Sequence, residues 1–180
     1  MSNYRDISKL VPDAQIKANK VVKYCRSKGV NISIYTTLRS LEQTARYYRQ
    51  SRSINGIMAK AVWLEDKGFD YLAKILIDVG ACYGEHVTNA TLGEDWHNYG
   101  EAFDSCPVDG SCNYLWDYEA NLDKWATYGE AVESVGMNWG GNWGGGFKDF
   151  PHAQLRTEPN PLNVYSPDEA KLIFKNLGLL

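Results

Sequence analysis

The stretch "GEDWHNYGEAFD", residues 93–104, holds one of only three histidines in the chain and ends on an aspartate. We expect His97 to lie on a loop, because the "NYG" after it turns the chain at Gly100. A strand should follow, in which alternate side chains point to opposite faces of the sheet. Asp104 would then share a face with the small Ala102, while the phenylalanine between them points into the core. This spacing predicts a carboxylate with open space beside it, where a metal could lie.

The composition is that of a globular protein. The chain has 180 residues, of which 44% are hydrophobic and 23% charged, and its net charge is −3. A chain of this length buries a core without disulfides, and its charge argues against nucleic acid as a partner. No apolar run is long enough to cross a membrane, and the first residues lack the apolar segment of a secretory signal. We therefore expect cytoplasmic synthesis, no stable membrane insertion and reduced thiols; Cys106 and Cys112 would close a small loop only in an oxidising compartment.

Helical and extended patterns follow one another without a regular rhythm. This mixture predicts an α+β fold rather than a doubly wound one. Residues 57–80 should form one or two helices, with a break near Gly68. The predicted helices cover residues 12–28, 40–52, 57–80, 117–136 and 166–178, and the predicted extended segments cover 30–37, 86–90 and 100–106.

The last predicted helix has the clearest boundaries. Ser166 is its expected N-cap, Pro167 its first residue, Glu169 the partner that completes a capping box, and Gly178 its end. Two other helices show an apolar side at helical spacing. The residues expected on those sides are Ile16, Val21 and Cys25 in the first helix, and Leu122, Trp125, Tyr128 and Val132 in helix 117–136.

A second stretch, "FKDFPHAQL" at residues 147–155, supplies the partners that His97 and Asp104 would need. Zinc accepts imidazole nitrogen and carboxylate oxygen, and a catalytic site has three protein ligands with a fourth position for water. His97, Asp104 and His152 form such a set, in which a bound water has a pKa of about 7. Asp149 would be the base, if the proline between it and His152 makes a turn. Alternatively, each of these residues is an ordinary loop or surface group without a metal.

Together these stretches resemble the M15 family of LAS-type zinc peptidases. That family includes D-alanyl-D-alanine carboxypeptidases, the VanX and VanY enzymes, and the L-alanyl-D-glutamate endopeptidases of phage endolysins. The resemblance lies in "DWHNYGEAFD" at 95–104 and in "WGGNWGGGFKDFPHAQL" at 139–155. It extends to "TLRS" at 37–40, which is followed by "YYRQSR", and to "HVTNA" at 86–90. It implies a small central antiparallel sheet flanked by helices, of the hedgehog and DD-peptidase type.

Residue by residue, the resemblance implies that His97, Asp104 and His152 bind Zn²⁺. It implies that Asp149 is the general base and acid. Arg39 would hold or polarise the scissile carbonyl group, although a structural salt bridge is the alternative for this residue. An aspartate at position 149 is more similar to the endopeptidases than to the dipeptidases, which favours the L-alanyl-D-glutamate bond.

The sequence departs from the family pattern at several places. Asp95 stands where a serine is usual, and its charge would disfavour a substrate carboxylate unless Asp95 is paired or turned away. Residues 53–85 are longer than expected, which predicts a helical insertion or, alternatively, a lid or wall-contact surface. Residues 157–180 would form a C-terminal helical extension, and residues 1–180 together a single catalytic domain.

Three aromatic residues near the predicted ligands have two interpretations. Tyr99 is expected in the core. Trp139 and Trp143 fit either the core or the walls of a substrate cleft. The glycines around them, at 140–141 and 144–146, would admit a close backbone approach, or form a plain flexible loop.

The expected function is that of a monomeric zinc metallopeptidase that cleaves bacterial peptidoglycan at the L-alanyl-D-glutamate bond. As a phage or prophage endolysin, it would wait in the host bacterial cytoplasm until a holin opens the membrane. One alternative is a D-alanyl-D-alanine carboxypeptidase or dipeptidase on the same scaffold. The other is a non-catalytic, zinc-containing module that binds the cell wall.

Overall fold

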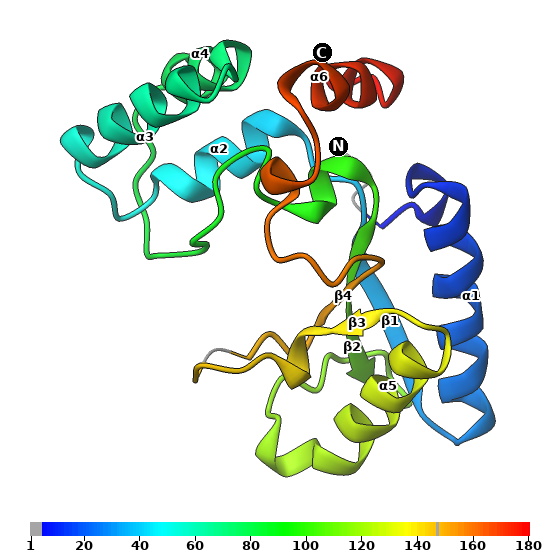
Figure 1. Ribbon diagram of the computed structural model, residues 1–180. Helices are drawn as coiled ribbons and strands as arrows, with labels where there is room; N and C mark the ends of the chain where they lie inside the picture. The colour runs from blue at the N-terminus through cyan, green and yellow to red at the C-terminus, as the bar shows by residue number, and fades with distance from the viewer. Residues whose placement is uncertain (1–4, 147) are drawn as a thin grey trace. The chain divides into compact units, whose positions relative to one another are not determined.

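The computed structural model describes residues 5–146 and 148–180 (Figure 1). Over these residues the chain forms six α-helices and a four-stranded antiparallel sheet, which confirms the α+β prediction. Its internal contacts group it into two compact units. The first unit contains the residues up to Leu38 together with Gly100–Thr157, and the second contains Arg39–Tyr99 together with Glu158–Leu180.

The sheet belongs to the first unit and has the strand order β1-β2-β4-β3. Its strands are β1 (Asn31–Thr36), β2 (Ala102–Val108), β3 (Asn138–Trp139) and β4 (His152–Gln154). The extended segments predicted at 30–37 and 100–106 are confirmed as β1 and β2. Because β2 is a central strand, it is paired on both sides, and its residues are almost all buried.

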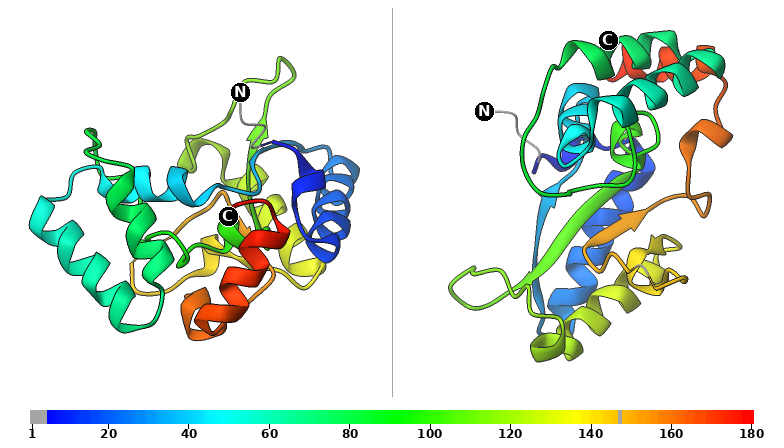
Figure 2. Two further views of the ribbon diagram at one scale, coloured as in Figure 1. Left: turned by 90° about the horizontal axis from the view of Figure 1, so that it is seen from above. Right: turned by 90° about the vertical axis from the view of Figure 1, so that its left-hand side faces the viewer.

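Helix α1 (Pro12–Ser27) packs against β1 and against a second helix of the same unit (Figure 2). The prediction that Ile16 faces the core is wrong, since its side chain is 56% exposed. The buried positions recur at intervals of four and three residues, and position 16 lies about 200° round the helix from the alanines that flank it. The buried residues of α1 are Ala14, Ala18, Val21 and Cys25.

Helix α5 (Leu122–Ser134) is shorter than the helix predicted over 117–136, because a 3-10 turn, Glu119–Asn121, precedes it. The predicted apolar side is confirmed for Trp125, Tyr128 and Val132, which are fully buried. It is wrong for Leu122, which is 52% exposed. Side chains tilt toward the N-terminus of a helix, so this first residue points past the end of the packed face.

The second unit is helical, with α2 (Leu41–Arg49), α3 (Ile54–Asp66), α4 (Asp70–Asp78) and α6 (Pro167–Asn176). Helices α3 and α4 form an antiparallel pair joined at Gly68, whose φ of 82° suits a glycine (Figure 2). The prediction of one or two helices over 57–80 is therefore confirmed, while the interpretation of 53–85 as a helical insertion stays a prediction. The single domain over 1–180 and the C-terminal extension over 157–180 also stay predictions.

Local signals explain where these helices begin and end. The capping box of α6 is confirmed, with the Ser166 hydroxyl and the Glu169 carboxylate each bonded to the other residue's backbone N–H. Helix α2 ends at Arg49 rather than at residue 52, since Ser51 has a left-handed φ of 62°. Residues 86–90 form no strand and run as an irregular segment. No helix in the described part of the chain has the length and apolarity that crossing a membrane requires.

Candidate metal centre

Two of the predicted ligands face each other across neighbouring strands. Asp104 of β2 and His152 of β4 are direct partners in the antiparallel register. The Nδ1 atom of His152 lies 3.3 Å from Oδ1 of Asp104, and both residues are more than 90% buried. Phe103, which precedes Asp104, lies in the hydrophobic core as the alternation predicted, and Ala102 is fully buried. The sheet therefore presents an imidazole and a carboxylate at one point.

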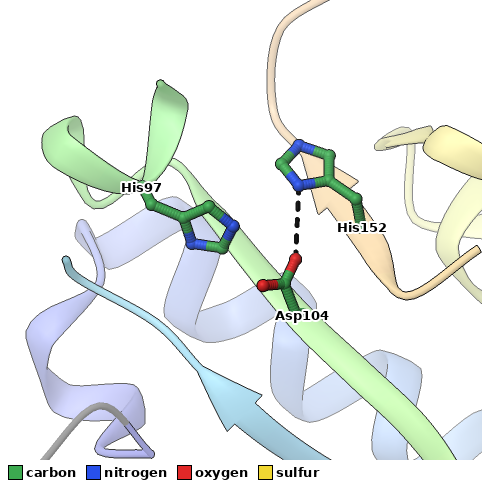
Figure 3. Close-up of side chains that lie close together, drawn as sticks. All are labelled: His97, Asp104 and His152. Carbon is green, nitrogen blue, oxygen red and sulfur yellow. Dashed lines mark hydrogen bonds and ion pairs between the residues drawn. The ribbon is translucent and has the colours of Figure 1, made fainter. Parts of the chain in front are cut away.

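The third predicted ligand, His97, lies in a short 3-10 helix, Trp96–Tyr99, just before β2. Its backbone is held on both sides: its N–H donates to Oδ1 of Asp95 over 3.0 Å, and its carbonyl oxygen accepts from the Arg39 N–H over 3.1 Å. One ligand atom each from His97, Asp104 and His152 lie within 4.8 Å of one another (Figure 3). Two imidazoles and one carboxylate are the donor types of catalytic zinc sites, so these residues fit such a metal.

The hydrogen bonds of His152 indicate which of its nitrogens faces a metal. Gln154 donates from its amide nitrogen to the Arg156 carbonyl over 2.7 Å, which leaves its oxygen Oε1 as an acceptor. That oxygen lies 3.0 Å from Nε2 of His152. In the neutral ring, Nε2 therefore carries the proton and Nδ1, on the side of Asp104, keeps its lone pair for a metal. Sequence reasoning missed Gln154, although its position two residues after His152 on one strand was a usable signal.

The charges near His152 favour its protonated form in the metal-free protein. Burial lowers the pKa of His152, but the hydrogen bond and charge of Asp104 oppose this effect. The charge of Asp149 and the hydrogen bond to Gln154 add to them, and the pKa ends above its ordinary value. A proton and a metal ion thus compete for the same nitrogen.

Asp149 lies at the start of a turn, as the proline between it and His152 predicted. The His152 N–H donates to the Asp149 carbonyl over 3.1 Å, which closes the turn. The hydroxyl of the buried Tyr128 donates to the carbonyl of Pro151 over 2.8 Å, which stabilises the turn. A side chain at Gly140 would overlap the Asp149 carbonyl, so the glycine there admits a close approach within the protein itself. Asp149 is not in the group of three ligands, and its charge still reaches His152.

Arg39 and Asp95 form an ion pair in the second unit. Nη1 of Arg39 lies 2.7 Å from Oδ2 of Asp95, with the side chains 15% and 9% exposed. Asp95 is therefore paired, which meets the condition under which an acidic residue is tolerated in place of the usual serine. The same carboxylate also accepts the His97 N–H, so it couples the orientation of Arg39 to the backbone of His97.

Asn98 is a further residue that sequence reasoning missed. Its amide nitrogen donates to the Arg39 carbonyl over 3.0 Å and to the Thr44 hydroxyl over 2.8 Å. Its amide oxygen accepts the Gly93 N–H over 2.9 Å. Asn98 is fully buried, and it ties the loop that carries His97 to the start of α2. An asparagine in a loop is too common for its type alone to have revealed this role.

The aromatic residues divide between the two interpretations. Tyr99 is buried in the second unit, and its ring packs against Phe174 and Tyr165, which confirms its place in the core. Trp139 is also buried, with its indole N–H donating to the Phe150 carbonyl over 2.8 Å. The Trp143 ring is partly exposed and lies 5.1 Å from the His152 ring, centroid to centroid. Of the two tryptophans, Trp143 is therefore the one beside a predicted ligand.

The four cysteines are free in the structure. Cys106 is buried in β2, where burial raises the pKa of its thiol to about 11. Cys112 lies on the exposed loop after that strand. Neither thiol is among the residues that could hold a metal in the described part of the chain.

Comparison with known proteins agrees with this geometry. Residues 88–155, which include all three predicted ligands and Asp149, match an M15 peptidase family model described as D-alanyl-D-alanine carboxypeptidase. The resemblance to the M15 peptidases is confirmed. Arg39 and the whole of the segment 53–85 lie outside the matched region.

Two curated relatives extend the likeness over most of the chain. The peptidoglycan L-alanyl-D-glutamate endopeptidase CwlK of Bacillus subtilis (strain 168) is 26% identical over 153 residues, which are 82% of this chain and 74% of that protein. The L-alanyl-D-glutamate peptidase of Listeria phage A118 is 23% identical over 150 residues, 83% of this chain. This chain spans only 39% of the length of the phage protein.

A solved structure is also similar. The Serratia marcescens L-Ala D-Glu endopeptidase ChiX aligns with a TM-score of 0.44 and 19% sequence identity. The alignment covers 86% of this chain and 87% of that one.

Proposed function

We propose that this protein is a zinc metallopeptidase that hydrolyses the L-alanyl-D-glutamate bond in the stem peptides of bacterial peptidoglycan. The observation that carries the proposal is the convergence of His97, Asp104 and His152, whose ligand atoms lie within 4.8 Å of one another. The match to an M15 peptidase family supports a peptidase, and the names of both curated relatives support this bond.

In this proposal His97, Asp104 and His152 hold the metal. A Zn²⁺ ion with three protein ligands supplies a Lewis acid and lowers the pKa of water to about 7. Gln154 keeps the proton of His152 on Nε2, so that Nδ1 is the ligand atom. The burial of the three side chains restricts the geometry in which they can bind.

The remaining steps belong to two other side chains. The Asp149 carboxylate accepts a proton from the attacking water and delivers it to the nitrogen of the leaving amine. The Arg39 guanidinium donates hydrogen bonds to the carbonyl oxygen as negative charge develops on it. Its ion pair with Asp95 over 2.7 Å fixes the direction of the guanidinium before substrate arrives. Both roles rest on the family resemblance, which the match over residues 88–155 supports for Asp149.

We further propose that the protein acts as a monomeric phage or prophage endolysin. It would accumulate in the host bacterial cytoplasm and reach the wall after holin-type release. The support for this proposal is the likeness to the peptidase of a Listeria phage. A D-alanyl-D-alanine carboxypeptidase is the second candidate, since the matching family model carries that description.

Digestion of purified peptidoglycan tests these proposals together. New N-terminal D-glutamate would identify the endopeptidase, and released D-alanine would identify the carboxypeptidase. His152→Ala should lose both metal and activity, whereas Asp149→Asn should keep the metal and lose activity. If Asp149→Asn still cuts, the base lies elsewhere. If the wild type binds the wall without cutting any bond, and chelation unfolds it, the protein is a binding module.

A further inference from the structure

The second unit contains a pocket of about 250 Å³ that includes none of the predicted metal ligands. It lies at the end of α2 and the start of α3, and is closed by the loop at 81–84. Its lining includes the polar residues Arg49, Ser51 and Arg52 and the apolar residues Ile54 and Ile57. No acidic side chain is among its lining residues in the described part of the chain.

Arg49 is a buried cation that has no carboxylate partner among the described residues. It is 8% exposed, and its one hydrogen bond to the described residues runs from Nη1 to the Leu76 carbonyl near the end of α4, over 2.8 Å. Its Nε atom is buried and has no acceptor. A guanidinium carries five N–H donors, so the contact with α4 uses only a fraction of its capacity. A buried charge without a counter-ion is costly for the folded state.

Arg52 lines the same pocket, and it too has no acidic partner among the described residues. It donates to the carbonyl oxygens of Tyr48 and Thr88, the latter over 2.7 Å, and lies over the Tyr48 ring at 3.9 Å. These partners are dipoles and a ring, and none is an anion. No ion pair involves either arginine among the residues that the structure describes.

Other partly buried cations of the same unit have acidic partners. Arg39 lies 2.7 Å from Asp95, and Lys60 lies 2.7 Å from Glu94. Arg49 and Arg52 both line one pocket, and no acidic side chain among the described residues neutralises their charge. The pocket therefore has the electrostatics of an anion site.

We propose that this pocket binds a small oxyanion, a carboxylate or a phosphate group, between Arg49 and Arg52. Ser51 lies on the exposed rim of the pocket, where its φ of 62° turns the chain between the two arginines. Ile54 and Ile57 provide an apolar wall for a short aliphatic group next to the anion. The pocket is separate from the proposed metal centre and does not depend on the proposed peptidase activity.

The test measures the melting temperature of the full chain, and heats of binding, with sodium acetate and with inorganic phosphate. Sodium chloride at the same ionic strength is the reference for screening. We expect a saturable rise in melting temperature with at least one probe, and saturable heat from the same probe. Arg49→Gln should weaken the affinity by about tenfold or more, as expected for the loss of a hydrogen bond to a charged group.

Two further variants control for charge and folding. Arg46→Gln removes the same charge from α2 outside the pocket and should bind the probe as the wild type does. Ser51→Asp places a carboxylate on the pocket wall and should abolish binding, whereas the uncharged Ser51→Asn should retain it. Asn and Asp both tolerate a left-handed φ. Because Ser51 is exposed, this pair decides the question even if Arg49→Gln fails to fold.

The two probes also identify the source of the ligand. A response to acetate that Ser51→Asp abolishes supports the proposal and assigns a carboxylate. The corresponding response to phosphate supports it and assigns a phosphate group. The proposal is overturned if neither probe binds beyond the chloride reference, or if Ser51→Asp binds as well as Ser51→Asn.

Discussion

Replacing Gln154 by leucine should weaken metal binding by about ten- to hundredfold, the usual effect of removing a side chain that orients a histidine ligand. In the structure, Oε1 of Gln154 accepts the Nε2 proton of His152 over 3.0 Å, and both residues are more than 90% buried. Without that acceptor, a buried N–H loses its partner, which costs about 1–3 kcal/mol. The proton is also released to move to Nδ1, the nitrogen that faces Asp104. A hundredfold loss corresponds to about 2.7 kcal/mol, within the same range.

The assay is competition for Zn²⁺ against a chromophoric chelator at a fixed pH, with a melting curve of each metal-free protein to show that it is folded. Gln154→Glu is the matched control, since a carboxylate still accepts the Nε2 proton and should keep the affinity near that of the wild type. The reasoning is refuted if Gln154→Leu binds Zn²⁺ as tightly as the wild type. It is equally refuted if Gln154→Glu loses as much affinity as the leucine variant.

The electrostatics and the packing give two further predictions. The raised pKa of His152 beside Asp104 stabilises the metal-free fold fully below about pH 6.5, and this stabilisation is lost as pH rises through the folded-state pKa. The melting temperature of chelator-treated protein should therefore fall as pH rises from about 6.5 through the folded-state pKa. His152→Gln should flatten this slope. Gly129→Ala should lower the unfolding free energy by about 1–3 kcal/mol, measured by urea denaturation, because the added methyl would overlap the ring of Trp139. Gly56→Ala, where the nearest atom is at an ordinary 3.5 Å, should instead gain about 0.5–1 kcal/mol, and equal effects of the two substitutions would contradict this packing argument.

Local patterns predicted most elements of the fold. The capping box at Ser166 and Glu169 marked the start of α6, and the alternation around Phe103 placed this residue correctly in the core. Errors occurred where tertiary packing overrides a local preference. Ile16 is apolar but lies opposite the packed side of α1, and the segment 86–90 looks extended but pairs with no strand.

For the candidate site, the sequence indicated which residues are metal ligands, but not which residues pair with the other side chains of the site. Two histidines and an aspartate in two family-like stretches were enough to predict the set His97, Asp104 and His152. The ion pair of Arg39 with Asp95 joins residues 56 positions apart, and no pattern in either segment indicates it.

The sequence by itself thus determined which residues have the chemistry of a metal site, and which short segments become helices or strands. These properties depend on side-chain type and on neighbours within a few residues. Only the tertiary structure decided that Asp104 lies opposite His152, 48 residues later, and that Gln154 directs the proton of that histidine. Such contacts follow from strand register and from burial of the whole sheet, where a polar group must find its partner among residues distant in the chain.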